Sequence, residues 1–341
     1  MPRDIRELLD AVSKKTDKVF EPSGEIEWRI PTGVLSLDLK LGGGIPVGMI
    51  TQLYGPELSG KSTLLQYIIG NALRMGKHVL YIPQESYSKE YAKICGIDID
   101  SPLLTIRAFE FGEHAVNFIV EAVRNYDTDV VALDSLPSIV PRKGIEKKAP
   151  TDDMDKGPEI GLRARLLGNF VERLSVPLIR KPAAFIAVNQ VRTDIGRFMS
   201  SQKPTGGIGL QHYTGLKLSM WGKTIANKDG NSIIESNVII KKGKVWMVRE
   251  FASTKFLVEH GIGIYLDHHL LNVCSVAGIV KKSGSWYQYK THKFQGADGF
   301  VEVMRSDNGL RKELVEAASL IDTNLIQDSV VEEIETTEED T

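Results

Sequence analysis

The chain has 341 residues, of which 42% are hydrophobic and 25% charged, so it can bury a substantial core. This length predicts one large domain with smaller appendages. No apolar stretch approaches the roughly 18 residues that span a bilayer, and residues 1–19 are charged rather than signal-like. The two cysteines, Cys95 and Cys274, lie far apart without metal-ligand spacing. We expect a soluble, cytoplasmic protein with no membrane partner, disulfide framework or zinc site.

The formal net charge of −2 is distributed unevenly along the chain. The last fourteen residues, 328–341, contain seven acidic residues and no Lys or Arg, so the rest of the chain has an excess of basic residues. This tail is expected to be disordered. It either competes with nucleic acid for basic sites or only keeps the terminus soluble, and the sequence leaves both interpretations open.

In chain order, residues 4–18 have the spacing of a short helix, and a linker with an extended segment follows over 21–29. Residues 31–258 then predict a long α/β region, with strands over 49–54, 78–82, 130–133 and 183–188 and helices over 62–75, 112–125 and 161–180. Such alternation favours a mostly parallel sheet covered by helices. A hairpin is expected over 233–248 around residues 242–244, and a small α+β module over 265–327.

Residues 55–63 match the phosphate-binding pattern G-x-x-x-x-G-K-[ST] in full, between an expected strand and an expected helix. Gly55 and Gly60 allow the backbone to wrap closely around phosphate oxygens. Lys61 is expected to reach the β- and γ-phosphates, and the Ser62 hydroxyl to bind Mg²⁺. The alternative is a chance glycine turn before a helix. We predict an ATP site formed by Gly55, Pro56, Glu57, Leu58, Ser59, Gly60, Lys61, Ser62 and Thr63.

Polar residues follow three of the expected strands, at the edge where ligands of parallel sheets bind. Asp134 is suited to holding Mg²⁺ through its water shell. Glu85 could orient and deprotonate an attacking water, and the Gln190 amide could sense the γ-phosphate. By residue type alone, Glu85 and Gln190 would more often be ordinary loop residues, and Asp134 could simply cap a turn.

A basic, glycine-containing segment over 191–209 predicts a DNA-binding loop. Its cationic side chains would neutralise phosphates without reading sequence, and its apolar side chains could wedge between bases. The residues concerned are Arg192, Ile195, Gly196, Arg197, Phe198, Met199, Lys203, Gly206 and Gly207. Residues 142–160 could form a second loop, although the alternative of a flexible surface loop with scattered charges fits that segment better than it fits 191–209.

Taken together, these motifs resemble the bacterial and phage RecA recombinases, in order and over nearly the whole chain. The resemblance is carried by residues 55–63, 91–100, 133–135, 161–165, 189–192, 205–207 and 284–290. It implies an α/β RecA-type P-loop ATPase core with a mostly parallel central sheet, an N-terminal helix and a small α+β C-terminal domain. The corresponding divisions are 1–32, 33–260, 261–327 and the acidic tail 328–341.

The resemblance also implies individual roles. Glu85 looks like the family's water-activating glutamate, Tyr91 like the aromatic that packs on adenine, and Gln190 like the γ-phosphate sensor. Lys242 and Lys244 look like a pair that reaches across a subunit interface to a neighbour's ATP, and the alternative is a solvated hairpin tip. The same match places Ile160 and Arg165 near DNA.

The implied activity is that of a recombinase which forms homo-oligomeric helical filaments on single-stranded DNA, pairs it with double-stranded DNA, and hydrolyses ATP with Mg²⁺. Two other classes use the same core, namely helicase-type motors and regulatory ATPases that do not bind DNA. The chain departs from the family pattern in several places. Pro83 replaces a usual acidic residue, one residue is missing between Glu85 and Tyr91, the first DNA loop is longer, Glu172 replaces a usual basic residue, and His212 replaces a usual aromatic.

Overall fold

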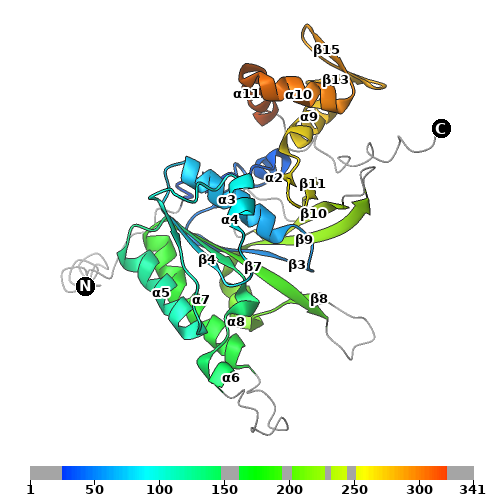
Figure 1. Cartoon of the computed structure of the whole chain (residues 1–341). Helices are drawn as coiled ribbons and strands as arrows, with labels where there is room; N and C mark the ends of the chain where they lie inside the picture. The colour runs from blue at the N-terminus through cyan, green and yellow to red at the C-terminus, as the bar shows by residue number, and fades with distance from the viewer. Residues whose placement is uncertain (1–24, 147–160, 194–201, 227–231, 244–250, 321–341) are drawn as a thin grey trace, which may run out of the picture.

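The computed structural model describes residues 25–146, 161–193, 202–226, 232–243 and 251–320, and Figure 1 shows their arrangement. The main sheet has ten strands, in the order β12-β11-β10-β9-β3-β7-β6-β4-β5, with β8 paired to β7. Within the described parts of the chain, no helix is long and apolar enough to cross a bilayer.

The sheet has a parallel half and an antiparallel half, which share β9. The parallel strands are β3 (Met49–Gly55), β4 (Val79–Pro83), β5 (Leu104–Ile106), β6 (Val130–Asp134), β7 (Ala184–Thr193) and β9 (Thr214–Ala226). The antiparallel strands that continue from β9 are β10 (Ser232–Gly243), β11 (Ser253–Glu259) and β12 (Gly263–Ile264). The predicted parallel, helix-covered sheet is confirmed, with an antiparallel extension in addition.

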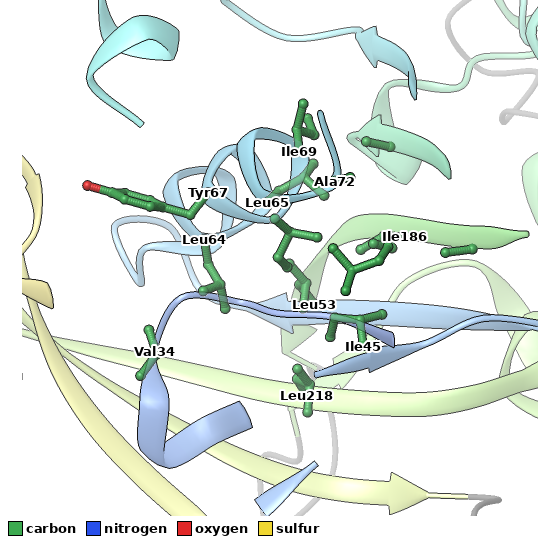
Figure 2. Close-up of a cluster of buried hydrophobic side chains, with 14 of the residues drawn as sticks. Val34, Ile45, Leu53, Leu64, Leu65, Tyr67, Ile69, Ala72, Ile186 and Leu218 are labelled. Atoms are coloured by element: carbon green, nitrogen blue, oxygen red, sulfur yellow. The ribbon is translucent and has the colours of Figure 1, made fainter. Parts of the chain in front are cut away.

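One face of the sheet is covered by α3 (Lys61–Arg74) and α4 (Lys89–Ile94). Figure 2 shows Leu65 of α3 directed towards Leu53 of β3 and Ile186 of β7, with Leu64 and Ile69 on the same helix. All five of these side chains are completely buried. This packing fixes the N-terminus of α3 directly after the end of β3, because burial of large aliphatic side chains is the main stabilising contribution to such a layer.

The opposite face is covered by α5 (Gly112–Asn125) and α7 (Leu162–Arg180). Phe170 of α7 packs edge-on against Phe185 of β7, with ring centroids 5.3 Å apart. Two short helices follow the strand ends on this side: the 3₁₀ helix η1 (Leu136–Ser138) and α6 (Arg142–Glu146). Helix α8 (Gly207–Tyr213) lies against α7 and leads into β9.

The remaining described elements are α2 with its flanking strands and the C-terminal part, and α2 lies beside the latter (Figure 1). Strands β1 (Arg29–Ile30) and β2 (Ile45–Pro46) enclose α2 (Leu35–Lys40). The C-terminal part has its own hydrophobic cluster, formed by α9 (Leu266–Val276), β13 (Lys281–Ser283), β14 (Trp286–Tyr289), β15 (His292–Gln295), α10 (Ala297–Ser306) and α11 (Asn308–Ser319). Leu35 and Leu39 of α2 pack against this cluster.

Two expectations from sequence need comment. The hairpin expected around residues 242–244 is misplaced, because β10 continues through Lys242 and Gly243, and its partner β11 begins only at Ser253. Hydrogen bonding to β9 along this length overrides the turn preference of a Lys-Gly-Lys sequence. The helix expected over 4–18 and the tail 328–341 lie outside the described residues.

Candidate functional site

The carboxyl ends of four neighbouring strands form the site. Gly55, at the end of β3, is paired with Gln190 of β7, and Pro83, at the end of β4, is paired with Asp134 of β6. The backbone N–H of Glu85 donates to the carbonyl of Asp134 at 3.2 Å, which fixes the position of Glu85 just beyond β4. The sheet therefore brings the phosphate loop and the three predicted polar residues to one edge.

The phosphate loop turns sharply into α3. Gly60 has a φ of 81° and is the N-cap of that helix, so its left-handed conformation favours glycine. The Lys61 ammonium is directed back into the loop, where it donates to the Pro56 carbonyl and, at 3.2 Å, to the Ser59 hydroxyl. Glu57 and Leu58 are exposed at the tip of the loop. The loop is thus a ring of backbone and hydroxyl groups around one ammonium.

The reason for glycine at position 55 differs from the prediction. A Cβ on Gly55 would lie 1.9 Å from the carbonyl oxygen of Met220, so the neighbouring strand β9 excludes any side chain there. A Cβ on Gly222 would likewise lie 2.4 Å from the carbonyl oxygen of Leu58. Both glycines let the phosphate loop lie against β9, and Gly222 was not identified from sequence because no local pattern marks it.

The electrostatics of the site centre on Asp134, which is 5% exposed. Burial raises the pKa of Asp134 to about 6, and the charge of Glu85 raises it as well, whereas a hydrogen bond from Ser62 and the charge of Lys61 lower it. One Asp134 carboxylate oxygen, Oδ1, is buried and has no hydrogen-bond partner. Burial lowers the pKa of Lys61, while the charges of Asp134, Glu85 and Glu57 raise it.

Glu85 is exposed, and two hydroxyl groups contact the same oxygen of its carboxylate. Ser135 donates to Oε1, and Ser138 donates to it at 3.4 Å. Gln84 anchors the preceding residue, because its side chain donates to the Phe109 carbonyl and accepts from the Phe109 N–H, both at 2.7 Å. The second oxygen of Glu85 remains the one that can accept a proton from solvent.

A pocket of about 200 Å³ lies beside the phosphate loop, lined by residues 58–63 together with Tyr91, Ile234, Val258 and His260. Tyr91 and Thr63 share a hydrogen bond of 3.0 Å, and burial raises the pKa of Tyr91 to about 12, so its hydroxyl stays neutral. The His260 ring stacks on Tyr91, with centroids 6.2 Å apart and an interplanar angle of 23°. Sequence analysis missed His260, which is far from the other motifs and belongs to none.

Gln190 lies next to an anchored loop. Asn189 donates from Nδ2 to the Thr205 carbonyl at 2.8 Å, and its Oδ1 accepts from the Thr205 hydroxyl at 2.6 Å and from the Gln190 N–H at 2.9 Å. Beyond this junction, Arg192 of β7 is paired with Lys203 of β8 (Gln202–Pro204). The predicted DNA loop therefore begins and ends at a two-stranded stem beside the phosphate loop.

The paired glycines at the end of this segment have a structural role. Gly206 and Gly207 have φ values of 106° and 80°, and a Cβ on Gly207 would lie 2.9 Å from that of Ala164 in α7. Arg165, the residue after Ala164 in α7, is exposed. The glycines thus allow α8 to begin directly against α7.

Lys242 contacts the end of α8. Its ammonium donates to the carbonyl of Gln211 at 2.9 Å and approaches that of His212 at 3.4 Å, at the end of α8. The remaining predicted residues lie outside the described part of the chain: Ile160, Ile195, Gly196, Arg197, Phe198, Met199 and Lys244.

The residues present fit a phosphate group and a divalent cation. The unpartnered, buried Oδ1 of Asp134 and the adjacent Ser62 hydroxyl are hard oxygen donors of the kind that Mg²⁺ prefers. In the described residues, no group of three or more His, Cys, Asp or Glu side chains gathers to hold a metal. A cation held here would accordingly take its other ligands from nucleotide phosphates and water.

Comparison with known proteins agrees with this geometry. Residues 18–265 match the family described as the RecA N-terminal domain. The protein RecA of Saccharopolyspora erythraea is 32% identical over 289 residues, covering 84% of this chain and 81% of its own. The protein RecA of Heliobacterium modesticaldum is 33% identical, covering 84% of this chain and 81% of its own. The protein RecA of Chloroflexus aurantiacus is 32% identical, covering 88% of this chain and 85% of its own. This chain therefore belongs to the RecA family of recombinases, which are DNA-dependent ATPases.

Proposed function

We propose that this chain binds ATP with Mg²⁺ at the carboxyl ends of β3, β4, β6 and β7 and hydrolyses it while assembled on single-stranded DNA. The phosphate loop would hold the phosphates through its backbone N–H groups, and Lys61 would leave the Pro56 carbonyl to bind them. Ser62 and Asp134 would hold Mg²⁺, which neutralises charge on the phosphates during transfer. Tyr91 and His260 would stack on the adenine.

Glu85 is the proposed general base. Its carboxylate lies beyond the end of β4, next to the predicted phosphate site, and Ser135 holds one of its oxygens. The other oxygen is available to orient a water molecule and take its proton. Attack of that water on the γ-phosphate would yield ADP and inorganic phosphate.

The observation that carries the proposal is the pairing of Gly55 with Gln190. Gly55 is the first residue of the phosphate loop. Gln190 directly follows Asn189, and Asn189 anchors the DNA-loop stem through its hydrogen bonds with Thr205. A γ-phosphate that attracts the Gln190 amide would change the same stem. The geometry thus supports ATP binding, rather than hydrolysis, as the signal that orders residues 191–209 for DNA.

This coupling would allow the protein to pair homologous DNA strands. The filament would hold single-stranded DNA, through Arg192 and the rest of the 191–209 loop, and test incoming duplex for complementarity. Exchanging one strand for an identical one breaks and forms equivalent base pairs, so pairing itself requires little net free energy. Hydrolysis at Glu85 would then weaken the filament and release the DNA.

The test is strand exchange between a circular single strand and a homologous linear duplex, with ATP and Mg²⁺. The wild-type chain should form joint molecules, and Lys61→Ala should form none while remaining folded by circular dichroism. A heterologous duplex is the matched control. Unwinding of the duplex without regard to homology would indicate a helicase instead, and exchange by Lys61→Ala at the wild-type rate would refute the proposal.

A further inference from the structure

The chain leaves β4 with hydrogen bonds to β6 on one side. The backbone ladder between β4 and β5 ends at Tyr81, before β4 itself ends at Pro83. On the β6 side, the N–H groups of Gln84 and Glu85 both donate to the Asp134 carbonyl, at 2.6 and 3.2 Å. The backbone that carries Glu85 is therefore held by β6, and a side chain supplies its contact on the β5 side.

That side chain is the amide of Gln84. Its Nε2 donates to the Phe109 carbonyl and its Oε1 accepts from the Phe109 N–H, both at 2.7 Å. A side-chain amide has the donor and the acceptor of a peptide group. A two-way exchange with one residue is also the pattern of a hydrogen-bonded pair in an antiparallel sheet. The Gln84 amide thus takes the place of a strand residue and joins the segment after β4 to the segment between β5 and α5.

Phe109, the residue that this amide holds, is fixed to the core. It packs against the hydrophobic cluster beneath α5 and α7. The centroid of its ring lies 5.2 Å from that of Phe118 in α5, at an interplanar angle of 48°. Aromatic pairs at this separation attract each other beyond the area that they bury. The amide clamp, defined as the two hydrogen bonds between Gln84 and Phe109, therefore ties the residue before Glu85 to the packed face of the sheet.

Glu85 is held at its other end by hydroxyl groups. Ser135 donates to Oε1, and Ser138 donates to the same oxygen at 3.4 Å. The carboxylate is close enough to the phosphate loop for its charge to act there. Burial has the largest effect on the pKa values of Asp134 and Lys61, and the charge of Glu85 raises both. A flexible side chain that is fixed at its backbone and at one oxygen presents the second oxygen in a defined direction.

We infer that Gln84 is a positioning residue for hydrolysis: its amide clamp on Phe109 holds the Glu85 carboxylate where it can orient a water molecule and take its proton. The inference rests on the proposed function and adds to it a residue that acts through Glu85. Alignment matters at this step, because a displacement of about 1 Å can lower the rate roughly 100-fold. The clamp is therefore expected to affect the chemical step and to leave nucleotide binding unchanged.

The first test is Gln84→Met, which keeps a side chain of similar length and removes both hydrogen bonds. DNA-stimulated kcat should fall at least about tenfold, the order expected for a small misplacement of a reacting group. The KM for ATP and the affinity for a fluorescent ATP analogue should stay as in wild type, because the phosphate loop and Tyr91 are unaltered. Gln288→Met, at an exposed glutamine of β14, is the matched control and should resemble wild type. A kcat of Gln84→Met close to that of wild type would overturn the inference.

A double variant with Gln84→Met and Glu85→Gln shows whether the clamp acts through Glu85. Glu85→Gln alone should retain only a trace of hydrolysis, measured as release of radiolabelled phosphate. The added Gln84→Met should not lower that trace further, since the effects of residues that act as a unit are not additive. A further loss as large as that of Gln84→Met alone would overturn the inference. Near-wild-type hydrolysis by Glu85→Gln would refute the base and the inference together, whereas an inactive Glu85→Gln beside a fully active Gln84→Met would remove the inference alone.

Hydrogen exchange at the Phe109 amide tests the clamp independently of catalysis. This N–H donates to Oε1 of Gln84, so its protection, followed by mass spectrometry of short peptides, should be lost in Gln84→Met. In Glu85→Gln and Gln288→Met the protection should stay as in wild type. Exchange in Gln84→Met as slow as in wild type would show that the amide does not hold Phe109, and would overturn the inference.

Discussion

Lys61 and Lys217 are both partly buried, but the charges that surround them differ in sign: acidic groups surround Lys61, and another lysine lies beside Lys217. Burial lowers the pKa of both. Around Lys61, however, the charges of Asp134, Glu85 and Glu57 favour the ammonium form, whereas the charged neighbour that affects Lys217 is another lysine, Lys242. Charges of both signs therefore meet around Lys61, whereas the charge that acts on Lys217 has the same sign as Lys217 itself.

This contrast predicts different consequences of removing a charge. At the phosphate loop, each charge is required for the chemistry, and its removal should be costly for activity. At Lys217, which contacts Gln211 of α8, removing the charge should relieve repulsion and the cost of burying an ammonium group. The predictions below test this contrast in order of decreasing effect.

Asp134→Asn should abolish Mg²⁺-dependent ATP hydrolysis, with a loss of at least about 100-fold, because the metal loses its carboxylate. The same substitution should stabilise the free protein. The pKa of Asp134 is about 6 in the folded state against an ordinary value of 3.8, so its contribution to stability is present below pH 3.8 and is lost as the pH rises through 6. At pH 7.5 the ionised carboxylate is unfavourable by about 1–3 kcal/mol, which Asn removes.

Thermal unfolding and ATP hydrolysis at pH 7.5 check both parts of this prediction. In the wild type, Mg²⁺ should also bind less tightly as the pH falls through about 6, since the proton competes for Asp134. An Asp134→Asn protein with a lowered Tm, or with wild-type hydrolysis, would show that Asp134 is not a buried metal ligand.

Lys217→Met should raise the free energy of unfolding of the free chain by about 1 kcal/mol at pH 7, a value reduced for the solvent exposure of the side chain. The sign follows from the pKa of Lys217, which is about 8 in the folded state against an ordinary value of 10.5. The penalty is complete below pH 8 and disappears above pH 10.5. Urea unfolding at pH 7 and at pH 10 should therefore show a gain at the lower pH alone.

Lys255→Met is the matched control for this stability measurement. Lys255 has a carboxylate partner within the chain, Glu235, at 3.2 Å. Its removal should leave the free energy of unfolding unchanged or lower it. Equal gains from both substitutions would mean that Lys217 is not distinguished by its missing counter-charge.

The smallest expected effect is a shift in the titration of Lys217 itself. Its rate of acetylation, measured by mass spectrometry across a pH series, should reach half of its maximum near pH 8, because only the neutral amine reacts. Lys242→Met should move this midpoint upward, since it removes the neighbouring positive charge. An unchanged midpoint in Lys242→Met would show that the two ammonium groups do not interact.

Much of the phosphate site could be predicted because its residues follow local patterns. The glycine loop, its flanking strand and its helix are contiguous in sequence. Asp134, Glu85 and Gln190 each follow an apolar run, and parallel strands place such positions along one edge. The predicted strands and helices of this half correspond closely to the observed ones for the same reason.

The other half depends on relations between strands that sequence does not reveal. The bulge that sets Lys242 opposite Lys217 is a feature of pairing, and nothing in the residues near Lys241 marks it. The requirement for glycine at position 222 comes from Leu58, more than 160 residues earlier. His260 likewise meets Tyr91 only through the fold. Local propensity could not have identified any of these contacts.

The most direct test of the account is ATP hydrolysis with and without single-stranded DNA, in wild type beside Glu85→Gln and Arg192→Ala. We predict strong stimulation by DNA in the wild type, no hydrolysis in Glu85→Gln, and loss of the stimulation in Arg192→Ala. Hydrolysis that is independent of DNA in the wild type, or retained in Glu85→Gln, would contradict a site at the carboxyl ends of these strands that is coupled to the DNA loop.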